Sequence, residues 1–182
     1  MKPYGTNIVT FRALLAGYEQ AVTRFGQVSR SRDPLQVFAP LFEALNWAVA
    51  LDDQARKHYA PEGEPLDWGW RSRVSGGEFV SAVRCARNRV HHQWADALTL
   101  SEGFSAPLVA PIVAHEWRWR CLAELPRSNH AKGRSAAKAL EAESAYVRLL
   151  AGHPARMVLG ELRAPFSQLA DLLEPPRPGR DS

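Results

Sequence analysis

The stretch "PLQVFAPLFEALNWAVALDDQARKHY" (residues 34–59) decides the fold, because it is the longest run of helical spacing in the chain. Asp33 before Pro34 places an N-cap acid next to a proline at the first helical position, which predicts where the helix begins. Pro40 lies within the first two turns and either delays the start of the helix or kinks it. The apolar residues recur every three or four positions, as expected for one buried face; they are Leu35, Phe38, Leu41, Phe42, Leu45, Trp47, Val49 and Leu51.

Similar spacing predicts helices on both sides of this stretch. "SRSRD" (29–33) separates it from an earlier helix, and the turn-rich "APEGEPLDWGW" (60–70) separates it from a later one. "SGGE" (75–78) has the pattern of a capping box at the start of that third helix, and "SEGFSAP" (101–107) follows its end. The predicted helices are 7–28, 34–59, 75–98, 135–150 and 154–173.

A segment rich in tryptophan and arginine interrupts the helical pattern near residues 99–134. Within "PLVAPIVAHEWRWRCL" (107–122), tryptophans alternate with arginines, which favours an extended, half-buried segment, although a short helix fits as well. The sequence therefore predicts an all-α bundle of about four to five helices with an irregular or short extended insertion. We expect a single domain over residues 1–174 and a disordered tail over 175–182.

The composition is that of one ordinary globular domain. The chain has 182 residues, of which 46% are hydrophobic and 23% charged, and its formal net charge is +4. Such a small basic excess is compatible with a nucleic-acid partner but does not require one. Two distant cysteines, Cys85 and Cys121, argue against a disulfide scaffold or a zinc ribbon. Because there is no signal-peptide pattern and no apolar run of about 18 residues, we expect a cytoplasmic protein without a membrane segment.

The end of the third predicted helix, "CARNRVHHQW" (85–94), concentrates guanidinium, amide and imidazole groups. On a helical wheel, Arg84, Asn88 and His91 stack at i, i+4 and i+7, with His92 beside them, opposite an apolar face. A guanidinium forks onto phosphate oxygens and stabilises developing negative charge. An imidazole titrates near neutrality and can transfer protons. This combination suits an RNA phosphodiester, although a solvated basic face is the alternative.

The residues "RNRVHH" (87–92) read Arg-Asn-x-x-x-His and resemble the R-x(4–6)-H signature of the HEPN superfamily. In that family the motif lies late in a core helix of an all-α bundle. Many members are metal-independent endoribonucleases of toxin–antitoxin and antiphage-defence systems, and they usually act as dimers. The resemblance implies that Arg87 and His92 are the catalytic pair and that Asn88 is the polar residue after the arginine. It also implies RNA as substrate, a homodimer, an antitoxin protein as a further partner, and no cofactor. It covers the third helix well and residues 41–54 loosely.

Two pairs of arginine and histidine remain open as the active pair. Arg87 and His92 lie about 140° apart on a regular helix, so they converge only where two subunits pool their side chains. Arg84 and His91 form an R-x(6)-H pair in line on one face, which makes them a rival or supporting set. A non-catalytic HEPN-like module that binds nucleotide or a protein partner is the alternative function, with the tryptophan-bearing insertion as its contact surface.

Several other residues are weaker candidates. The two tryptophans of the insertion either stack on bases or anchor the insertion to the core. The acidic residues Glu43, Asp52 and Asp53 either order the arginines of the third helix by ion pairing or are plain surface acids. No metal site is expected, because His115-Glu116 lacks the second histidine of HExxH and adjacent helical histidines diverge. Basic residues that could follow an RNA backbone are Arg89, Arg118, Arg120, Arg127, Lys132 and Arg134.

Overall fold

A computed structural model describes residues 8–59, 69–93, 96–106, 112–126 and 134–173. For some residues at the edges of these ranges, His92 among them, only the backbone is described. The helices are α1 (Ile8–Val28), α2 (Pro34–Tyr59), α3 (Glu78–Gln93), α4 (Arg134–Leu149), α5 (Ala155–Glu161) and α6 (Arg163–Leu173). The strands are β1 (Leu98–Ala106) and β2 (Ile112–Trp119), and short 3-10 helices span η1 (Gly69–Arg73) and η2 (Leu122–Glu124). The predicted helical bundle is confirmed, and the insertion is a two-stranded hairpin.

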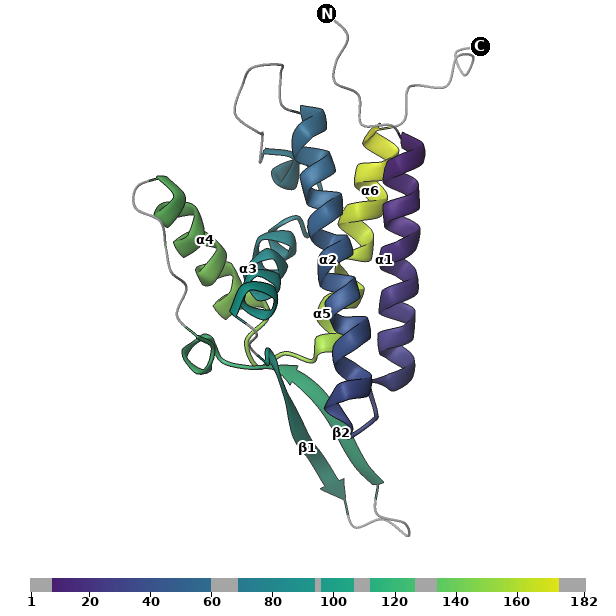
Figure 1. Cartoon of the computed structure of the whole chain (residues 1–182), viewed down its shortest axis with the longest axis vertical. Coiled ribbons are helices and arrows are strands. Elements are labelled where there is room, and N and C mark those ends of the chain that lie inside the picture. The colour runs from purple at the N-terminus through teal and green to yellow at the C-terminus, as the bar shows by residue number, and fades with distance from the viewer. Residues whose placement is uncertain (1–7, 60–68, 94–95, 107–111, 127–133, 174–182) are drawn as a thin grey trace, which may run out of the picture.

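The helix α2 is the centre of the bundle. It packs against α1 on one side and α3 on the other, while α6 runs beside α1 and α4 covers α3 (Figure 1). Its start follows the predicted chemistry, because the backbone N–H of Leu35 donates to Oδ1 of Asp33 at 2.9 Å. The α1–α2 contact is close at Gly17, where an added Cβ would stand 2.8 Å from Cε2 of Trp47. Glycine there lets the two helices approach.

Among the described residues, one helical stretch, Pro34–His58, is long and apolar enough to cross a membrane by length and composition alone. In the structure its apolar residues Leu41, Leu45 and Leu51 are buried in the protein core. Packing between helices therefore accounts for these three apolar residues.

The hairpin is anchored to the bundle by its tryptophans. Trp117 and Trp119 are 7% and 1% exposed and lie opposite Leu100 and Leu98 across the antiparallel pair. Nε1 of Trp117 donates to the carbonyl of Ser31 at 2.8 Å. The hairpin projects from the end of the bundle where α2 begins (Figure 1). These contacts confirm the extended conformation and the role of both tryptophans as core anchors.

Three predicted boundaries were wrong. The third helix ends at Gln93, five residues early, because Leu98 pairs with Trp119 in the hairpin; "SEGFSAP" is consequently largely strand. The same helix begins at Glu78, and in place of the predicted bond to Glu78 the N–H of Ser75 donates to Oε1 of Gln168 at 3.1 Å. The predicted helix 154–173 is divided at Leu162, whose N–H bonds to the carbonyl of Gly160 and so leaves the i−4 pattern. The predicted tail 175–182 lies outside the described residues.

Candidate functional site

The helices α2 and α3 run antiparallel and meet through two groups of side chains. From the start of α2 to its end, Phe42 contacts His91, Asn46 contacts Arg87, and Asp53 contacts Arg84. The aspartate cluster lies toward the end of α2 and consists of Asp52, Asp53, Arg56, Trp70, Arg71, Ser81 and Arg84. The amide cluster lies toward its start and consists of Phe42, Asn46, Arg87, Asn88 and His91.

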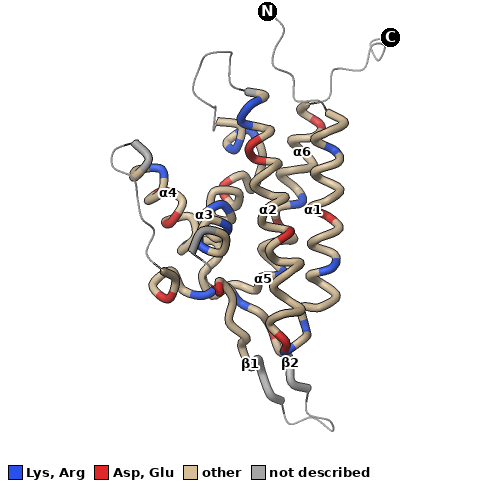
Figure 2. The backbone as a smooth tube through the Cα atoms, viewed as in Figure 1, with Lys and Arg blue, Asp and Glu red and all other residues tan. Residues whose placement is uncertain are grey.

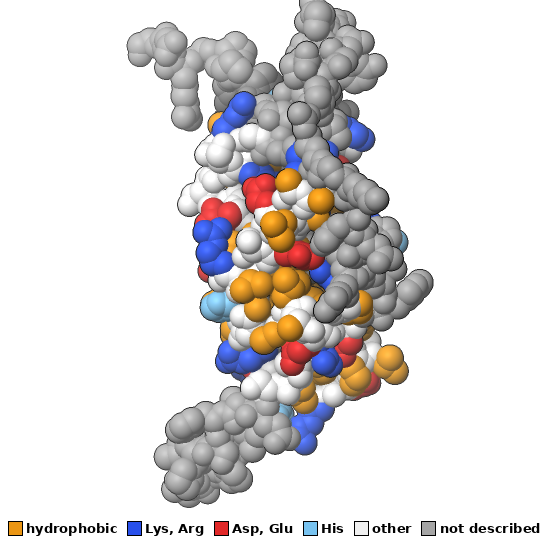
Figure 3. Space-filling model, turned by 90° about the vertical axis from the view of Figure 1, so that its left-hand side faces the viewer, with side chains coloured by type: hydrophobic (Ala, Val, Ile, Leu, Met, Phe, Trp, Pro, Cys, Tyr) orange, Lys and Arg blue, Asp and Glu red, His pale blue; other side chains and the backbone are white. Residues whose placement is uncertain are grey.

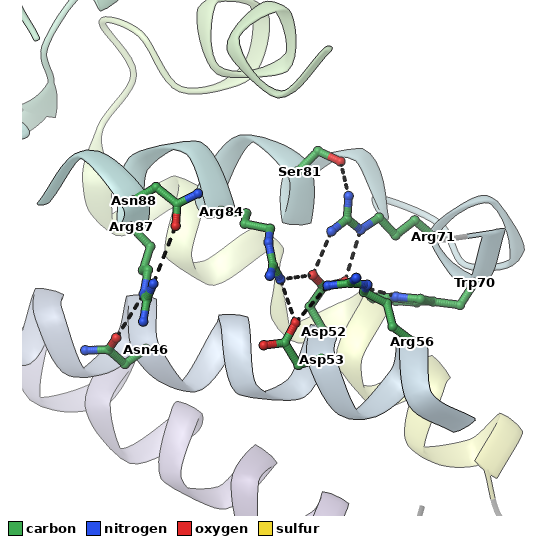
Figure 4. Close-up of polar contacts among 10 residues, drawn as sticks. All are labelled: Asn46, Asp52, Asp53, Arg56, Trp70, Arg71, Ser81, Arg84, Arg87 and Asn88. Atoms are coloured by element: carbon green, nitrogen blue, oxygen red, sulfur yellow. Dashed lines mark hydrogen bonds and ion pairs between the residues drawn. The ribbon is translucent and has the colours of Figure 1, made fainter. Parts of the chain in front are cut away.

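The aspartate cluster is organised around the carboxylate of Asp52, which is fully buried. It accepts from Nε1 of Trp70 at 3.1 Å, from Nε and Nη2 of Arg71 at 3.1 and 2.7 Å, and from Nη1 of Arg84 at 2.6 Å (Figure 4). Nη1 of Arg71 also donates to Oγ of Ser81 at 2.5 Å. Carboxylate and guanidinium groups are therefore buried together and bonded to one another, as buried charges require.

A second carboxylate completes this cluster. Oδ1 of Asp53 accepts from Nη1 of Arg84 at 2.9 Å and from Nη1 of Arg56 at 3.0 Å. Arg84 is thus held by two acids of α2, which confirms that Asp52 and Asp53 order an arginine of α3. The same expectation was wrong for Glu43, which pairs with Arg24 of α1. Two carboxylates bind the guanidinium of Arg84 and hold it between α2 and α3. Its part in a rival or supporting pair with His91 stays a prediction.

The amide cluster presents an arginine to neutral oxygen atoms. Nε of Arg87 donates to Oδ1 of Asn46 at 3.2 Å, and its Nη1 lies 3.5 Å from Oδ1 of Asn88 (Figure 4). Nδ2 of Asn46 donates to the carbonyl of Phe42 at 2.9 Å, which fixes the amide so that its oxygen faces Arg87. These bonds orient the guanidinium without neutralising its charge.

The electrostatic surroundings of Arg87 leave it cationic. Burial lowers the pKa of Arg87, with Arg84 adding to the shift and Asp53 opposing it. A guanidinium is so strongly basic that it stays protonated at neutral pH even when its pKa is lowered in this way. Arg87 is partly exposed and Asn88 is exposed, so the charge can be reached from solvent.

The imidazole of His91 lies one helical turn from Arg87, on the side of α3 that faces α2. Its ring stacks on Phe42 with centroids 5.5 Å apart and planes 7° apart. Phe42 is in turn stacked on Phe38, with ring centroids 5.9 Å apart and planes 22° apart. The structure therefore groups His91 with Arg87, whereas the helical wheel had grouped it with Arg84. His92 lies in the last turn of α3, and its side chain lies outside the described residues.

One of the weaker RNA-binding candidates was wrong. Arg89 is 4% exposed and pairs with Glu143 of α4, so it connects two helices and cannot reach an RNA backbone. Arg118 donates to Glu116 at 2.6 Å and to the carbonyl of Gly152 at 2.9 Å. Arg120 donates to the carbonyl of Leu98 at 3.0 Å and lies 3.5 Å from Asp96. RNA contact by Arg118 and Arg120, both partly exposed, stays a prediction. Arg127, Lys132 and the side chain of Arg134 lie outside the described residues.

The sequence did not indicate that Asn46 orients Arg87, or that Phe38 and Phe42 stack in one row with His91. Phe38, Phe42 and Asn46 recur at four-residue steps along α2, a spacing that places them in one row. The phenylalanines were counted only as core residues. Figure 2 shows acidic and basic residues interspersed along the helices, so the row is not marked by a large charged patch. Within the described ranges, no three histidine, cysteine or acidic side chains gather to hold a metal ion.

Comparisons of the chain with protein-family models, with curated proteins and with solved structures give no match in any of the three.

Proposed function

We propose that this protein is a metal-independent endoribonuclease of HEPN type. The single observation that supports this best is the different fate of the arginines on α3. Arg84 and Arg89 are bonded to carboxylates, whereas Arg87 is oriented by the amide oxygens of Asn46 and Asn88. Arg87 is partly exposed, so a phosphate can approach it from solvent, and a guanidinium binds phosphate through two parallel hydrogen bonds. Arg87 and Asn88 are also residues that the HEPN resemblance assigns to the site.

The proposed reaction is a transesterification within RNA. His92 acts as general base and takes the proton of a ribose 2′-OH, so that O2′ attacks the adjacent phosphorus. Arg87 stabilises the negative charge of the phosphorane as the O2′–P bond forms and the P–O5′ bond breaks. The partner subunit's His92, or water, protonates the leaving 5′-oxygen. The products are a 2′,3′-cyclic phosphate and a 5′-OH, and DNA cannot react because it lacks the 2′-OH.

A homodimer completes this site in the proposal. Since Arg87 and His92 diverge by about 140° on a regular helix, their side chains act together when two copies of α3 pool them in one cleft. His91, one turn from Arg87, supports the same site or serves as the base in place of His92. As a toxin or antiphage-defence effector, the protein would act on cytoplasmic RNA and be restrained by an antitoxin protein.

The alternative of a non-catalytic module binding nucleotide uses the same amide cluster. In its other form, a protein-binding module, the tryptophans of the insertion would be the contact surface. Trp117 and Trp119 are buried, which speaks against that form. Binding without cutting therefore remains the outcome that separates the two functions.

The direct test is incubation of the purified protein with total RNA in EDTA, followed by detection of 2′,3′-cyclic phosphate ends. We expect cleavage of RNA but not of DNA. We expect His92→Ala to reduce cleavage by roughly 10²–10⁴-fold, the usual contribution of a general acid or base. His153→Ala is the matched control, because His153 is exposed on a different part of the fold. Undiminished cleavage by folded His92→Ala would exclude His92, and the same result for His91→Ala would end the nuclease proposal.

A further inference from the structure

A row of aromatic rings extends from the amide cluster toward the start of α2. His91, Phe42 and Phe38 stack in that order, with centroid separations of 5.5 and 5.9 Å. Their planes differ by 7° and 22°, so the three rings are close to parallel. Along the axis of α2, Phe38 and Asn46 are about 12 Å apart, since a helix rises about 1.5 Å per residue. The row therefore connects the surroundings of Arg87 with the first turns of α2.

The far end of this row is exposed to solvent. Phe38 is 42% exposed although Phe42 stacks on it, and Leu35, one turn nearer the start of α2, is 81% exposed. Exposed aromatic rings next to a row of stacked rings offer a π-face to which another flat ring can add. The stacked row thus ends in an open position.

Positive charge lies close to this open end. Arg30 and Arg32 immediately precede α2 and are both exposed. Nε of Arg32 donates to Nε2 of His115 at 2.8 Å. A surface that combines an aromatic platform with cations is the usual means of binding single-stranded nucleic acid.

We infer that Phe38 is a base-stacking site for single-stranded RNA, and that a base placed there guides the strand toward Arg87. This inference rests on the proposed nuclease function and adds the contact that would hold a nucleotide near the scissile phosphate. The near-parallel order of the rings favours a nucleobase over an apolar protein segment, because a protein partner has no need of coplanar rings. Another exposed apolar surface offers a contrast, because Leu140 and Val147 of α4 are exposed and aliphatic. Figure 3 shows hydrophobic side chains among charged ones on one face of the molecule.

The probe is a single-stranded 2′-O-methyl oligoribonucleotide with 2-aminopurine placed at successive positions. It lacks the attacking 2′-OH, so binding can be measured whether or not the protein is a nuclease. Stacking on an aromatic ring quenches 2-aminopurine fluorescence. We expect quenching at one position of the bound strand with the wild-type protein and with Phe38→Tyr. We expect Phe38→Leu to abolish the quenching and to weaken binding about tenfold, as for loss of one base–aromatic stack. Leu140→Ala is the control and should change neither.

The possible results separate the two proposals. If Phe38→Leu binds and quenches like the wild type, or if the wild type neither binds nor quenches, the stacking site is wrong. Retained affinity in Phe38→Leu would mean that stacking of a base on Phe38 does not hold the strand. If the wild type quenches through Phe38 but does not cut unmodified RNA, the stacking site stands and the nuclease proposal fails. If RNA is cut and Phe38→Leu leaves affinity and quenching unchanged, the nuclease stands and the stacking site is wrong.

Discussion

The two ends of the α2–α3 interface hold arginines in opposite ways. In the aspartate cluster, the guanidinium of Arg84 is bonded to Asp52 and Asp53 and is partly buried. In the amide cluster, about one turn along the same helix, the guanidinium of Arg87 meets the amide oxygens of Asn46 and Asn88. The residue type and the helix are the same, and only the partners differ.

This difference teaches that partner chemistry decides what an arginine can do. A buried carboxylate compensates the charge of a guanidinium and holds it, so that removing either partner leaves an isolated charge. An amide oxygen accepts a hydrogen bond and sets the orientation while the charge remains able to attract a phosphate. One end of the interface therefore stabilises the fold, and the other end is suited to binding.

The largest effect is expected where the carboxylate is most buried. Asp52→Asn keeps the shape of the side chain but removes the buried negative charge that Arg71 and Arg84 share. We expect a loss of about 3–5 kcal/mol in the free energy of unfolding, or roughly 6–20 °C in Tm. Thermal and urea unfolding measure this change. Asp53→Asn is the control, because Asp53 is 41% exposed and should cost about 1 kcal/mol or less. Equal stability of both variants would mean that Asp52 does not organise the cluster.

The two arginines themselves should separate stability from activity. We expect Arg87→Gln to lower RNA cleavage by roughly 10²–10³-fold, the usual loss when a donor that stabilises transition-state charge is removed. Its Tm should stay close to the wild-type value. Arg84→Gln should instead lower the Tm, because it leaves the buried Asp52 with one cation fewer. Cleavage rates measured at a temperature where both variants are folded decide the matter. If Arg87→Gln cleaves RNA as fast as the wild type, Arg87 does not take part in the reaction.

Local chemistry in the sequence was enough to predict most of the fold. Asp33 and Pro34 fix the start of α2 through one capping bond, and the alternation around Trp117 and Trp119 correctly indicated an extended segment. What could not be predicted depends on residues far apart in sequence. The third helix stops early because Leu98 pairs with a strand residue 21 positions later, 119 − 98 = 21, and local helical spacing says nothing of that pairing.

The site was predicted in part for the same reason. The sequence placed Arg87 in the first candidate pair, Arg84 in the rival or supporting pair and Arg89 among the weaker RNA-binding candidates. A helical wheel shows only which face each of them occupies. Arg84 meets Asp52 from 32 residues away, and Arg89 meets Glu143 from 54 residues away. The register between helices decides these partners, and one sequence does not reveal that register. Asn46 was missed because a single amide among apolar residues carries no motif.

A substitution at Asn46 should make the amide cluster resemble the aspartate cluster. Asn46→Asp replaces the amide that faces Arg87 with a carboxylate, so we expect Arg87 to form an ion pair there. RNA binding and cleavage should fall by about tenfold, because phosphate must then compete with the new carboxylate. Stability should change by no more than about 1 kcal/mol, as the site is partly exposed. Asn46→Gln, which keeps a neutral amide, is the control. Undiminished cleavage by Asn46→Asp would show that the neutrality of this partner is unimportant.

The smallest effect concerns the Cys85 thiol, which lies near the ion pair of Arg89 with Glu143 on the side of α3 that faces α4. Burial raises the pKa of the Cys85 thiol to about 11, with Glu143 adding to the shift and Arg89 opposing it. An arginine free of its acid would instead favour the thiolate and lower that pKa.

Because the folded-state pKa lies above the ordinary value of 9.0, the thiol stabilises the fold below about pH 9 and less so as pH rises toward 11. At pH 10 the loss is about 1.4 kcal/mol, or about 3–6 °C in Tm. Comparing Tm against pH for the wild type and Cys85→Ala isolates this contribution, since other ionisations are common to both proteins. A Tm difference between them that stays constant from pH 7 to pH 10 would mean that the pKa of the Cys85 thiol is not raised in the folded state.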